Sequence, residues 1–229
     1  MNLDFTTTAV CRPKLLRRTY KSFNRKMLDV DFKKSTLYLN VDPVPYNKDP
    51  MDVVNVAKEF FGEVIYNIPE KANFSNALRW CWSQTKGKML FHLEDDWKMM
   101  KKFEISDILN YLSINRGPKA GRIHGTAGAE VIGVSLRVYG FKDFRICLTP
   151  SLFDAEWARN VCKKISPQHN PEQKIREVCK SQFCSYHYPR KNIYARLVQD
   201  TGRTWLEKTI YKKNGHPNRW FEWELKKKM

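Results

Sequence analysis

A run of ten residues, Lys88–Trp97 (KMLFHLEDDW), carries the clearest chemical signal in the sequence. Its first half is apolar apart from His92, and its length and polar edges are typical of a buried central strand. The run continues into three consecutive carboxylates, Glu94, Asp95 and Asp96. Neighbouring acids repel one another unless a cation lies among them. Because ligands collect at the carboxyl ends of strands in open α/β sheets, we predict a site there for Mg²⁺ or Mn²⁺, held by one or two carboxylates and by substrate phosphates.

A structural role for the acids is the alternative. Carboxylates in a first helical turn interact favourably with the helix dipole, so the three acids could begin a helix. The segment that follows, residues 97–105 (WKMMKKFEI), shows no helical period. The sequence therefore favours the metal site.

Strands and helices alternate in the first half of the chain. Strands are expected at residues 5–11, 36–42, 64–66 and 89–93. Helices are expected after Arg12-Pro13 for about fourteen residues, up to Gly62 from residue 53, and over residues 73–86 with Gly87 as the C-cap. This alternation predicts an α/β fold with a Rossmann-like, mostly parallel central sheet that has helices on both faces.

The second half is less regular. Helices are expected at residues 105–114, 154–165 and 171–182, the last with Asn170 as its N-cap, and strands at 131–139, 144–148 and 193–198. The tail from residue 201 has no clear period. The length of 229 residues predicts a single domain, with residues 1–98 and 99–229 as its two halves.

The charge of the chain predicts a polyanionic partner. There are 41 basic and 24 acidic residues, a net charge of +17. Part of the excess forms a stripe on the first expected helix, made of Lys14, Arg18, Lys21 and Arg25. No apolar run is long enough to span a membrane, and no signal peptide is evident at the N-terminus, so a soluble cytoplasmic protein is expected.

In their order and spacing, four segments resemble the nucleotide-sugar-dependent glycosyltransferases of the type A fold. They are residues 6–23 (TTTAVCRPKLLRRTYKSF), 38–43 (YLNVDP), 73–88 (NFSNALRWCWSQTKGK) and 90–97 (LFHLEDDW). The last looks like the DxD-type metal motif of that family. The resemblance covers residues 5–98 well and is loose beyond them. The compactness is similar to that of small glycosyltransferases from tailed bacteriophages, which would act in the host cytoplasm.

The resemblance implies a donor site for a nucleoside-diphosphate sugar. A metal ion on Asp96, with Asp95 or Glu94, would neutralise the diphosphate as a Lewis acid and help it to leave. Asp42 resembles the acid that accepts a hydrogen bond from the base, typically uracil N3–H, so a UDP-sugar is the expected donor; a turn before Pro43 is the alternative role.

Other donor contacts implied by the resemblance are spread along the chain. Nucleoside contacts are expected from Thr7 and Thr8, a base or phosphate contact from Arg12, a further base contact from Lys71 or Asn73, and closure over the diphosphate from Arg203. For the last three, a solvated surface role is the alternative. An inverting transfer also needs a carboxylate base, for which Asp154 and Glu172 are the candidates. Glu172 could equally stabilise the first turn of a helix.

The expected acceptor follows from the C-terminal composition. Residues 190–229 contain eleven basic and four acidic residues, interleaved with Tyr194, Trp205, Tyr211, Trp220, Phe221 and Trp223. Cations neutralise phosphates and aromatic rings stack on bases, so DNA is favoured, with a hydroxymethylated pyrimidine of phage DNA flipped out as the acceptor. The alternatives are a glycan- or lipopolysaccharide-directed transferase and a non-catalytic nucleic-acid-binding protein. The sugar, its stereochemical course and the oligomeric state are left open.

Overall fold

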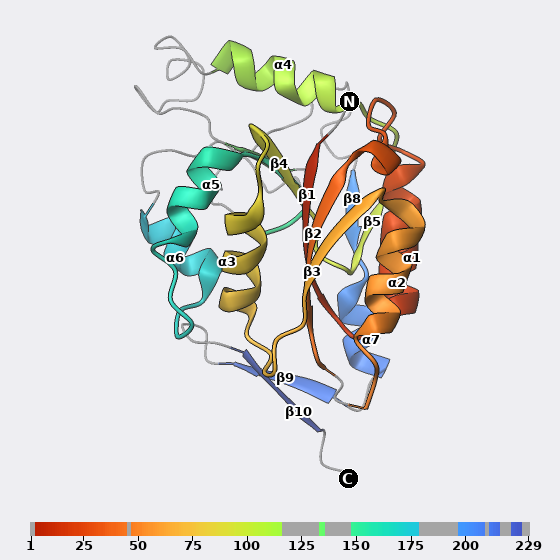
Figure 1. Ribbon diagram of the computed structural model, residues 1–229, viewed down its shortest axis with the longest axis vertical. Helices are drawn as coiled ribbons and strands as arrows, with labels where there is room; N and C mark the ends of the chain where they lie inside the picture. Colours follow the sequence, from red (N-terminus) through yellow and green to blue (C-terminus); the bar gives the residue numbers. More distant parts are fainter. Residues whose placement is uncertain are drawn as a thin grey trace.

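A six-stranded sheet forms the centre of the molecule, with the strand order β3-β2-β1-β4-β7-β6 (Figure 1). The computed structural model describes residues 3–44, 47–115, 133–135, 148–178, 197–208, 211–215 and 221–225. Four neighbouring strands are parallel, and the last two are antiparallel to their neighbours. The strands are β1 (Asp4–Val10), β2 (Thr36–Asp42), β3 (Glu63–Asn67), β4 (Met89–His92), β6 (Gly133–Ser135) and β7 (Ser151–Asp154). The expected α/β fold with a mostly parallel sheet is therefore confirmed.

Helices cover both faces of the sheet (Figure 1). On one face lie α1 (Pro13–Asn24) and α2 (Met51–Phe60), and on the other lie α3 (Phe74–Gln84), α5 (Ala155–Cys162) and α6 (Pro171–Val178). A two-stranded sheet of β5 (Trp97–Met99) and β8 (Val198–Asp200) lies beside α1. The remaining elements are the 3₁₀ turn η1 (Phe32–Lys34), α4 (Ile105–Asn115), α7 (Gly202–Lys208) and the hairpin of β9 (Tyr211–Gly215) and β10 (Phe221–Leu225). None of the helices in these ranges is long and apolar enough to cross a membrane.

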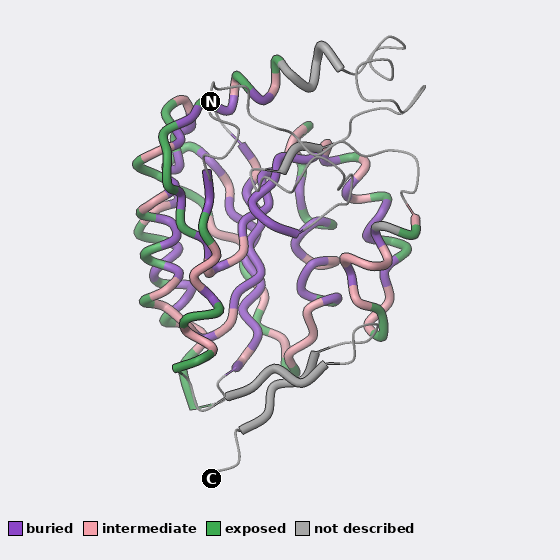
Figure 2. Tube along the Cα trace, turned by 180° about the vertical axis from the view of Figure 1, so that it is seen from behind, coloured by how far each residue is buried: buried purple, intermediate pink, exposed green. Residues whose placement is uncertain are grey.

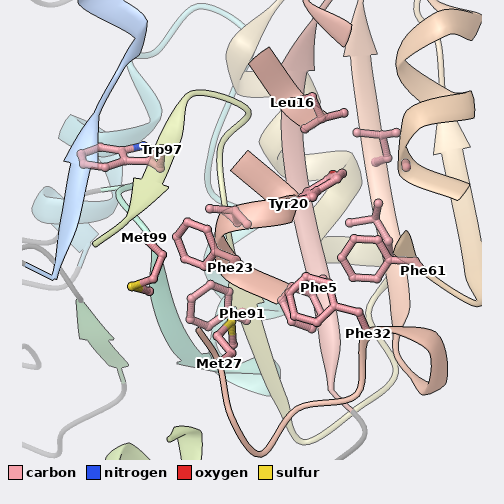
Figure 3. Close-up of a cluster of buried hydrophobic side chains, with 14 of the residues drawn as sticks. Phe5, Leu16, Tyr20, Phe23, Met27, Phe32, Phe61, Phe91, Trp97 and Met99 are labelled. Carbon is pink, nitrogen blue, oxygen red and sulfur yellow. The ribbon is translucent and has the colours of Figure 1, made fainter. Parts of the chain in front are cut away.

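An aromatic cluster fixes α1 and α2 on the sheet (Figure 3). The ring of Phe5 from β1 lies 4.7 Å from Phe32, 5.1 Å from Phe61 and 5.5 Å from Phe91, measured between ring centroids. The inner face of α1 is fully buried against this cluster, while its basic stripe remains outside, as the periodicity predicts. Figure 2 shows the same division between a buried centre and exposed outer helix faces. This packing sets the distance between α1 and the carboxyl end of β4.

A second core lies under α3 and α5, and it contains a buried histidine. Trp82 packs on Phe153 of β7 and on Trp157 of α5, and its indole Nε1 donates to Nδ1 of His92 over 3.4 Å. Thr6 Oγ1 lies 3.0 Å from the same nitrogen. Among the described residues, Nε2 of His92 has no hydrogen-bond partner. Burial lowers the pKa of His92 to about 3, so the imidazole is neutral in the folded protein.

We expect His92 to lower the free energy of unfolding as the pH falls from 7 to 5. Below the ordinary pKa of 6.5 the unfolded chain binds a proton at this imidazole, whereas the folded chain binds one only near pH 3. Between pH 7 and pH 5 this difference removes about 2 kcal/mol from the free energy of unfolding. Urea unfolding of the wild type and His92→Gln at both pH values measures it: the loss should be smaller by that amount in the variant. Unchanged pH dependence in His92→Gln, matching that of the exposed-site variant His169→Gln, would contradict the prediction.

The first half agrees with the sequence more closely than the second. The strand at 36–42 has the predicted bounds, and β1, α1, α2 and β3 begin and end within about two residues of the expected positions. The role predicted for Gly87 is wrong, because α3 ends at Gln84 with the extended Thr85 as its C-cap, and the Gly87 N–H donates to Asp4. Gly62 serves a different purpose from a helix cap: a Cβ there would lie 2.0 Å from the Lys33 carbonyl oxygen.

Several elements of the second half were not expected. Strand β7 occupies residues that precede the predicted helix, and β5 forms where the sequence shows no period. The expected helices match α4, α5 and the described part of α6. At the start of α6, the side-chain oxygen of Asn170 accepts a hydrogen bond from Gln173 N, as expected of an N-cap residue. Most of the predicted strands at 131–139, 144–148 and 193–198 lies outside the described residues.

Candidate functional site

A pocket at the carboxyl ends of β1, β2 and β4 collects residues that are far apart in the sequence. The strands end there with polar side chains, and the first turn of α3 closes the pocket on one side. Its lining is Thr8, Ala9, Val10, Arg12, Asp42, Ala72, Asn73, Phe74, Glu94, Asp95 and Asp96. All three predicted metal-binding acids and four of the predicted nucleotide-binding residues, Thr8, Arg12, Asp42 and Asn73, therefore share one pocket.

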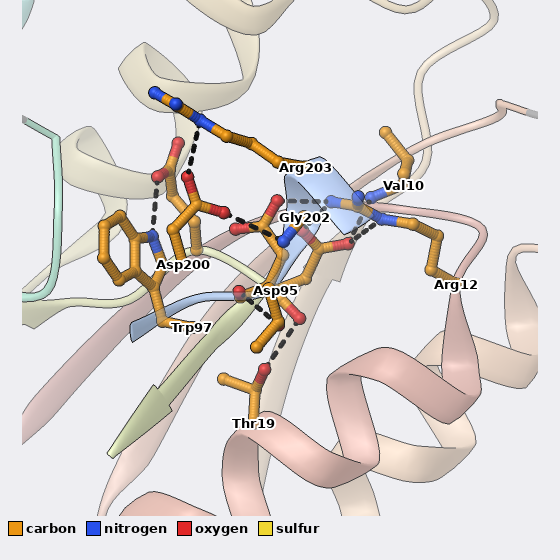
Figure 4. A network of polar contacts seen from close by, with 11 residues as sticks. Val10, Arg12, Thr19, Asp95, Trp97, Asp200, Gly202 and Arg203 are labelled. Carbon is orange, nitrogen blue, oxygen red and sulfur yellow. Dashed lines mark hydrogen bonds and ion pairs between the residues drawn. The ribbon is translucent and has the colours of Figure 1, made fainter. Parts of the chain in front are cut away.

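The guanidinium of Arg12 supplies the cation that the three acids require (Figure 4). It forms a bidentate ion pair with Asp95, in which Nε donates to Oδ2 over 3.0 Å and Nη2 donates to Oδ1. The same Nη2 donates to Oδ2 of Asp96 over 3.1 Å. The Val10 N–H adds a donor to Asp95 Oδ2 over 3.2 Å. Asp95 is thus fully engaged by the end of β1, and Arg12 contacts acids where the sequence suggested a base or phosphate contact.

Burial and mutual charge perturb the pKa values of this cluster. Burial, followed by the charge of Asp95, raises the pKa of Asp96 to about 6 against the attraction of Arg12. Burial disfavours the charge of Arg12, but Asp95 and Asp96 outweigh it and raise the pKa of the guanidinium further above neutral pH. Burial and the neighbouring charge thus disfavour the ionised form of Asp96, which is the condition under which an additional cation is favourable.

The C-terminal residues Thr201 and Gly202 contact the acids, and Thr201 fixes the backbone of Asp96. Thr201 donates to the Asp96 carbonyl oxygen twice, from its N–H over 2.8 Å and from its hydroxyl over 2.6 Å. Thr19 of α1 donates its hydroxyl to the Asp95 carbonyl oxygen over 2.8 Å. Gly202 lies so close that a Cβ would be 2.0 Å from Asp96 Oδ2. The ring of Trp205 lies under Arg12, 4.8 Å from its guanidinium carbon.

Asp42 is held by a chain of amides across the sheet edge. Asn67 at the end of β3 donates to Asn40 Oδ1 over 2.7 Å, and Asn40 donates to Asp42 Oδ1 over 2.9 Å. Asp42 itself is 7% exposed and lines the pocket. Asn40 of β2 and Asn67 of β3 thus fix the orientation of the Asp42 carboxylate at the pocket.

Asn73 combines a structural contact with its place in the pocket. Its side-chain oxygen caps α3 by accepting from Asn76 N over 2.9 Å, and its amide donates to the Pro167 carbonyl oxygen over 3.1 Å. Three other predicted donor residues are not among the pocket lining. Thr7 is fully buried within β1, Lys71 is exposed, and the 81% exposed Arg203 side chain pairs with Asp200 over 3.5 Å.

The structure separates the two candidate bases. Asp154 is opposite Met89 at the start of β4, at the other end of the sheet from the acids, and its carboxylate caps α5 by accepting from Trp157 N over 2.9 Å. Asp154 is therefore not part of the pocket lining, and neither is Glu172. Glu172 is in the first turn of α6, beside the start of α3, and its Oε1 accepts from Leu148 N over 2.9 Å.

The donor set can hold a divalent ion only with help from a ligand. Among the described residues, no group of three or more acidic, histidine or cysteine side chains is arranged around a common ion position. Asp95 is saturated, whereas only Oδ2 of Asp96 accepts a hydrogen bond from the described part of the chain. Mg²⁺ and Mn²⁺ are often held by one or two carboxylates with substrate phosphates and water completing the shell. Asp96, with Glu94 beside it in the pocket, fits that arrangement.

Several residues that contact the pocket acids were not indicated by the sequence, because they reach the pocket from distant parts of the chain. Thr19, Asn40 and Asn67 hold the acids of the pocket, and Thr201 and Gly202 reach them from the far end of the chain. The sequence Asp200-Thr201-Gly202-Arg203 is typical of a turn, but it does not indicate that Thr201 and the first residue of α7 contact Asp96. Trp205, expected to stack on nucleic-acid bases, lies against Arg12. The side chains of the other C-terminal aromatic residues lie outside the described residues.

The α/β fold, with its mostly parallel sheet and helices on both faces, matches that of solved glycosyltransferases of the type A fold. No protein-family model matches the sequence, and no curated protein matches it significantly. Solved structures with this fold are similar in three dimensions. S. aureus TarS in complex with UDP has a TM-score of 0.52 at 9% identity, over 78% of this chain and 55% of the other.

Two further structures agree with this assignment. The mannosyltransferase PcManGT from Pyrobaculum calidifontis, in complex with GDP-Man and Mn²⁺, has a TM-score of 0.52 at 10% identity, over 81% of this chain and 54% of the other. The apo-form glycosyltransferase GlyE of Streptococcus pneumoniae has a TM-score of 0.51 at 11% identity, over 81% and 45%. The chain thus spans about half the length of these proteins, and the similarity establishes the fold.

Proposed function

We propose that the protein is a metal-dependent glycosyltransferase that moves a sugar from a nucleoside-diphosphate sugar, with UDP-sugar favoured, to an acceptor hydroxyl. The pocket carries the proposal. It combines an oriented acid at the end of β2, backbone and side-chain donors at the end of β1, and three acids after β4, all at the carboxyl edge where α/β folds bind ligands. TarS and PcManGT, which share the fold, were solved with UDP and with GDP-Man and Mn²⁺.

The donor would place its base near Asp42 and its diphosphate near the acids. Asp42 offers an acceptor for a base N–H, and Thr8 lies between the two regions of the pocket. We assign the metal to Asp96, with Glu94 as the second carboxylate, because Asp95 is committed to Arg12. The metal would supply positive charge for the departing diphosphate.

The acceptor proton requires a base close to the pocket. Glu172 is the remaining candidate, because α6 begins beside the first turn of α3, where Asn73 and Phe74 line the pocket. As the acceptor we propose a hydroxyl on DNA, in particular a hydroxymethylated pyrimidine of phage DNA, on the strength of the net charge of +17. A glycan or lipopolysaccharide hydroxyl is the alternative.

One observation favours a different class of function. Arg12 pairs with Asp95 and contacts Asp96, which is also the arrangement expected of an acidic cluster with a purely structural role in a non-catalytic nucleic-acid-binding protein. Donor binding distinguishes the two.

We would titrate UDP into the protein calorimetrically, with and without Mn²⁺, and repeat both titrations with Asp96→Ala. We expect binding that requires Mn²⁺ in the wild type and weakens at least about tenfold in the variant, because the metal loses its protein ligand. Glu70→Ala, which removes an exposed acid outside the pocket lining, is the control and should bind as the wild type does. GDP is titrated in the same way. If neither UDP nor GDP binds with or without Mn²⁺, the proposal is overturned in favour of a non-catalytic nucleic-acid-binding protein.

A further inference from the structure

A basic groove lies between α1 and the β5–β8 sheet, on the outer side of the acids. Its volume is about 550 Å³, and it is outside the pocket described above. The floor is apolar, from Leu15, Trp97 and Met99, and the walls carry Arg18, Lys21, Arg25, Lys26 and Lys98. No acidic side chain is part of this lining. The groove is therefore a concave surface with charge of a single sign.

The cations of the groove are available to a ligand. Arg18, Lys21, Arg25 and Lys98 are exposed, and in the described part of the chain no acidic side chain pairs with any of them. Arg17, on the same helix but outside this groove, is instead paired with Glu59. A solvating surface would mix the two signs of charge, as at Arg17 and Glu59, whereas this groove concentrates one sign.

Hydrogen bonds hold the two walls together. Ser22 of α1 accepts from Met99 N over 2.9 Å, and Lys26 Nζ donates to the carbonyl oxygens of Met99 and Met100 over 3.0 and 2.8 Å. These hydrogen bonds hold α1 against β5, so the backbone that carries the remaining cations is fixed on both sides of the groove. Arg18, Lys21 and Arg25 are three and four residues apart on one helix face, about 4.5 and 6 Å along its axis.

Three residues of the groove lining also hold the acids of the candidate active site. Thr19 lines the groove and donates to the Asp95 carbonyl oxygen, and Thr201 lines it and donates to the Asp96 carbonyl oxygen. Trp97 lines it as well and donates from Nε1 to Glu94 Oε2 over 3.1 Å. Three residues of the groove lining thus each donate a hydrogen bond to one of the three acids.

We propose that this groove binds the sugar-phosphate backbone of DNA and guides it to the pocket; the guiding role depends on the proposed transferase function, whereas the binding does not. Phosphates recur along each strand of a duplex, so a row of unpaired cations can neutralise several of them, and arginine matches phosphate geometry. The groove joins the basic stripe of α1, which the sequence already links to a polyanionic partner, to Lys98 of β5.

The test is fluorescence anisotropy of a short fluorescein-labelled DNA duplex at several salt concentrations. In the triple variant Arg18→Ala/Lys21→Ala/Arg25→Ala we expect affinity to fall at least about tenfold and the salt slope to fall by about 2 to 3, since up to three phosphate contacts are lost. The matched control, Lys86→Ala/Lys163→Ala/Lys164→Ala, removes three exposed charges on the α3–α5 side of the sheet and should keep the wild-type slope to within about 1.

The alternatives give different results. Equal losses of DNA affinity in both triple variants would show that net charge alone binds DNA, and would overturn the proposal that the groove is the binding site. Binding of polygalacturonate, but not of DNA, in a manner that the groove variant abolishes would overturn the choice of nucleic acid. UDP titration of the same variants separates this inference from the transferase: DNA binding that needs the groove, in a protein that never binds UDP, would support the groove and reject the proposed function.

Discussion

Replacing Arg12 with alanine is expected to lower the free energy of unfolding by about 3–5 kcal/mol. The side chains of Arg12 and Asp95 are 9% and 3% exposed, so within the described part of the chain the substitution leaves a buried carboxylate with one backbone donor and no counter-charge. It also removes the guanidinium from the Trp205 ring. Urea unfolding at pH 7 measures the loss.

Arg17→Ala is the matched control for this prediction. Arg17 also pairs with a carboxylate, Glu59, but both side chains are almost half exposed, so its removal should cost no more than about 1 kcal/mol. Adding Asp95→Asn to Arg12→Ala should restore part of the stability, because the uncompensated charge is then gone. Similar small losses in Arg12→Ala and Arg17→Ala would show that the buried pair does not stabilise the site.

Gly202→Ala is expected to disturb both folding and donor chemistry. The new methyl would lie 2.0 Å from Asp96 Oδ2 and 2.7 Å from its carboxyl carbon, so the carboxylate or the 200–203 turn must move by about 1 Å or more. Overpacking of this kind costs about 1–3 kcal/mol of unfolding free energy. If Asp96 holds the metal, a displacement of this size also lowers Mn²⁺-dependent donor turnover by about 100-fold.

Gly87→Ala provides the comparison for Gly202→Ala. It adds the same methyl where the nearest atom is 3.2 Å away, at the Asp4 carboxylate, so a shift of a few tenths of an ångström accommodates it. We expect Gly87→Ala to retain donor turnover, measured as UDP release. Gly202→Ala with wild-type stability and turnover would show that the C-terminal turn does not position Asp96.

The first half of the fold could be read from the sequence because its signals are local. Apolar runs such as that of β4 and the one-sided periodicity of α1 arise from neighbouring residues, and each predicts its own element. Strand β7 was not foreseen because its four residues are shorter than the usual strand signal and form a strand only through pairing with β4. Its direction then carries Asp154 away from the pocket.

The sequence by itself determined the α/β class, the three acids after β4 and the need for a cation among them, because strand periods and charge repulsion depend on residue type and local spacing. Only the tertiary structure decided which cation lies there and which acids it leaves for a ligand. The Arg12 guanidinium reaches Asp95 because β1 and β4 are adjacent and parallel, and Thr201 and Gly202 reach Asp96 because β8 pairs with β5. The hydrogen bonds from Arg12 to Asp95 and from Thr201 to Asp96 join residues 83 and 105 positions apart, and no local pattern encodes them.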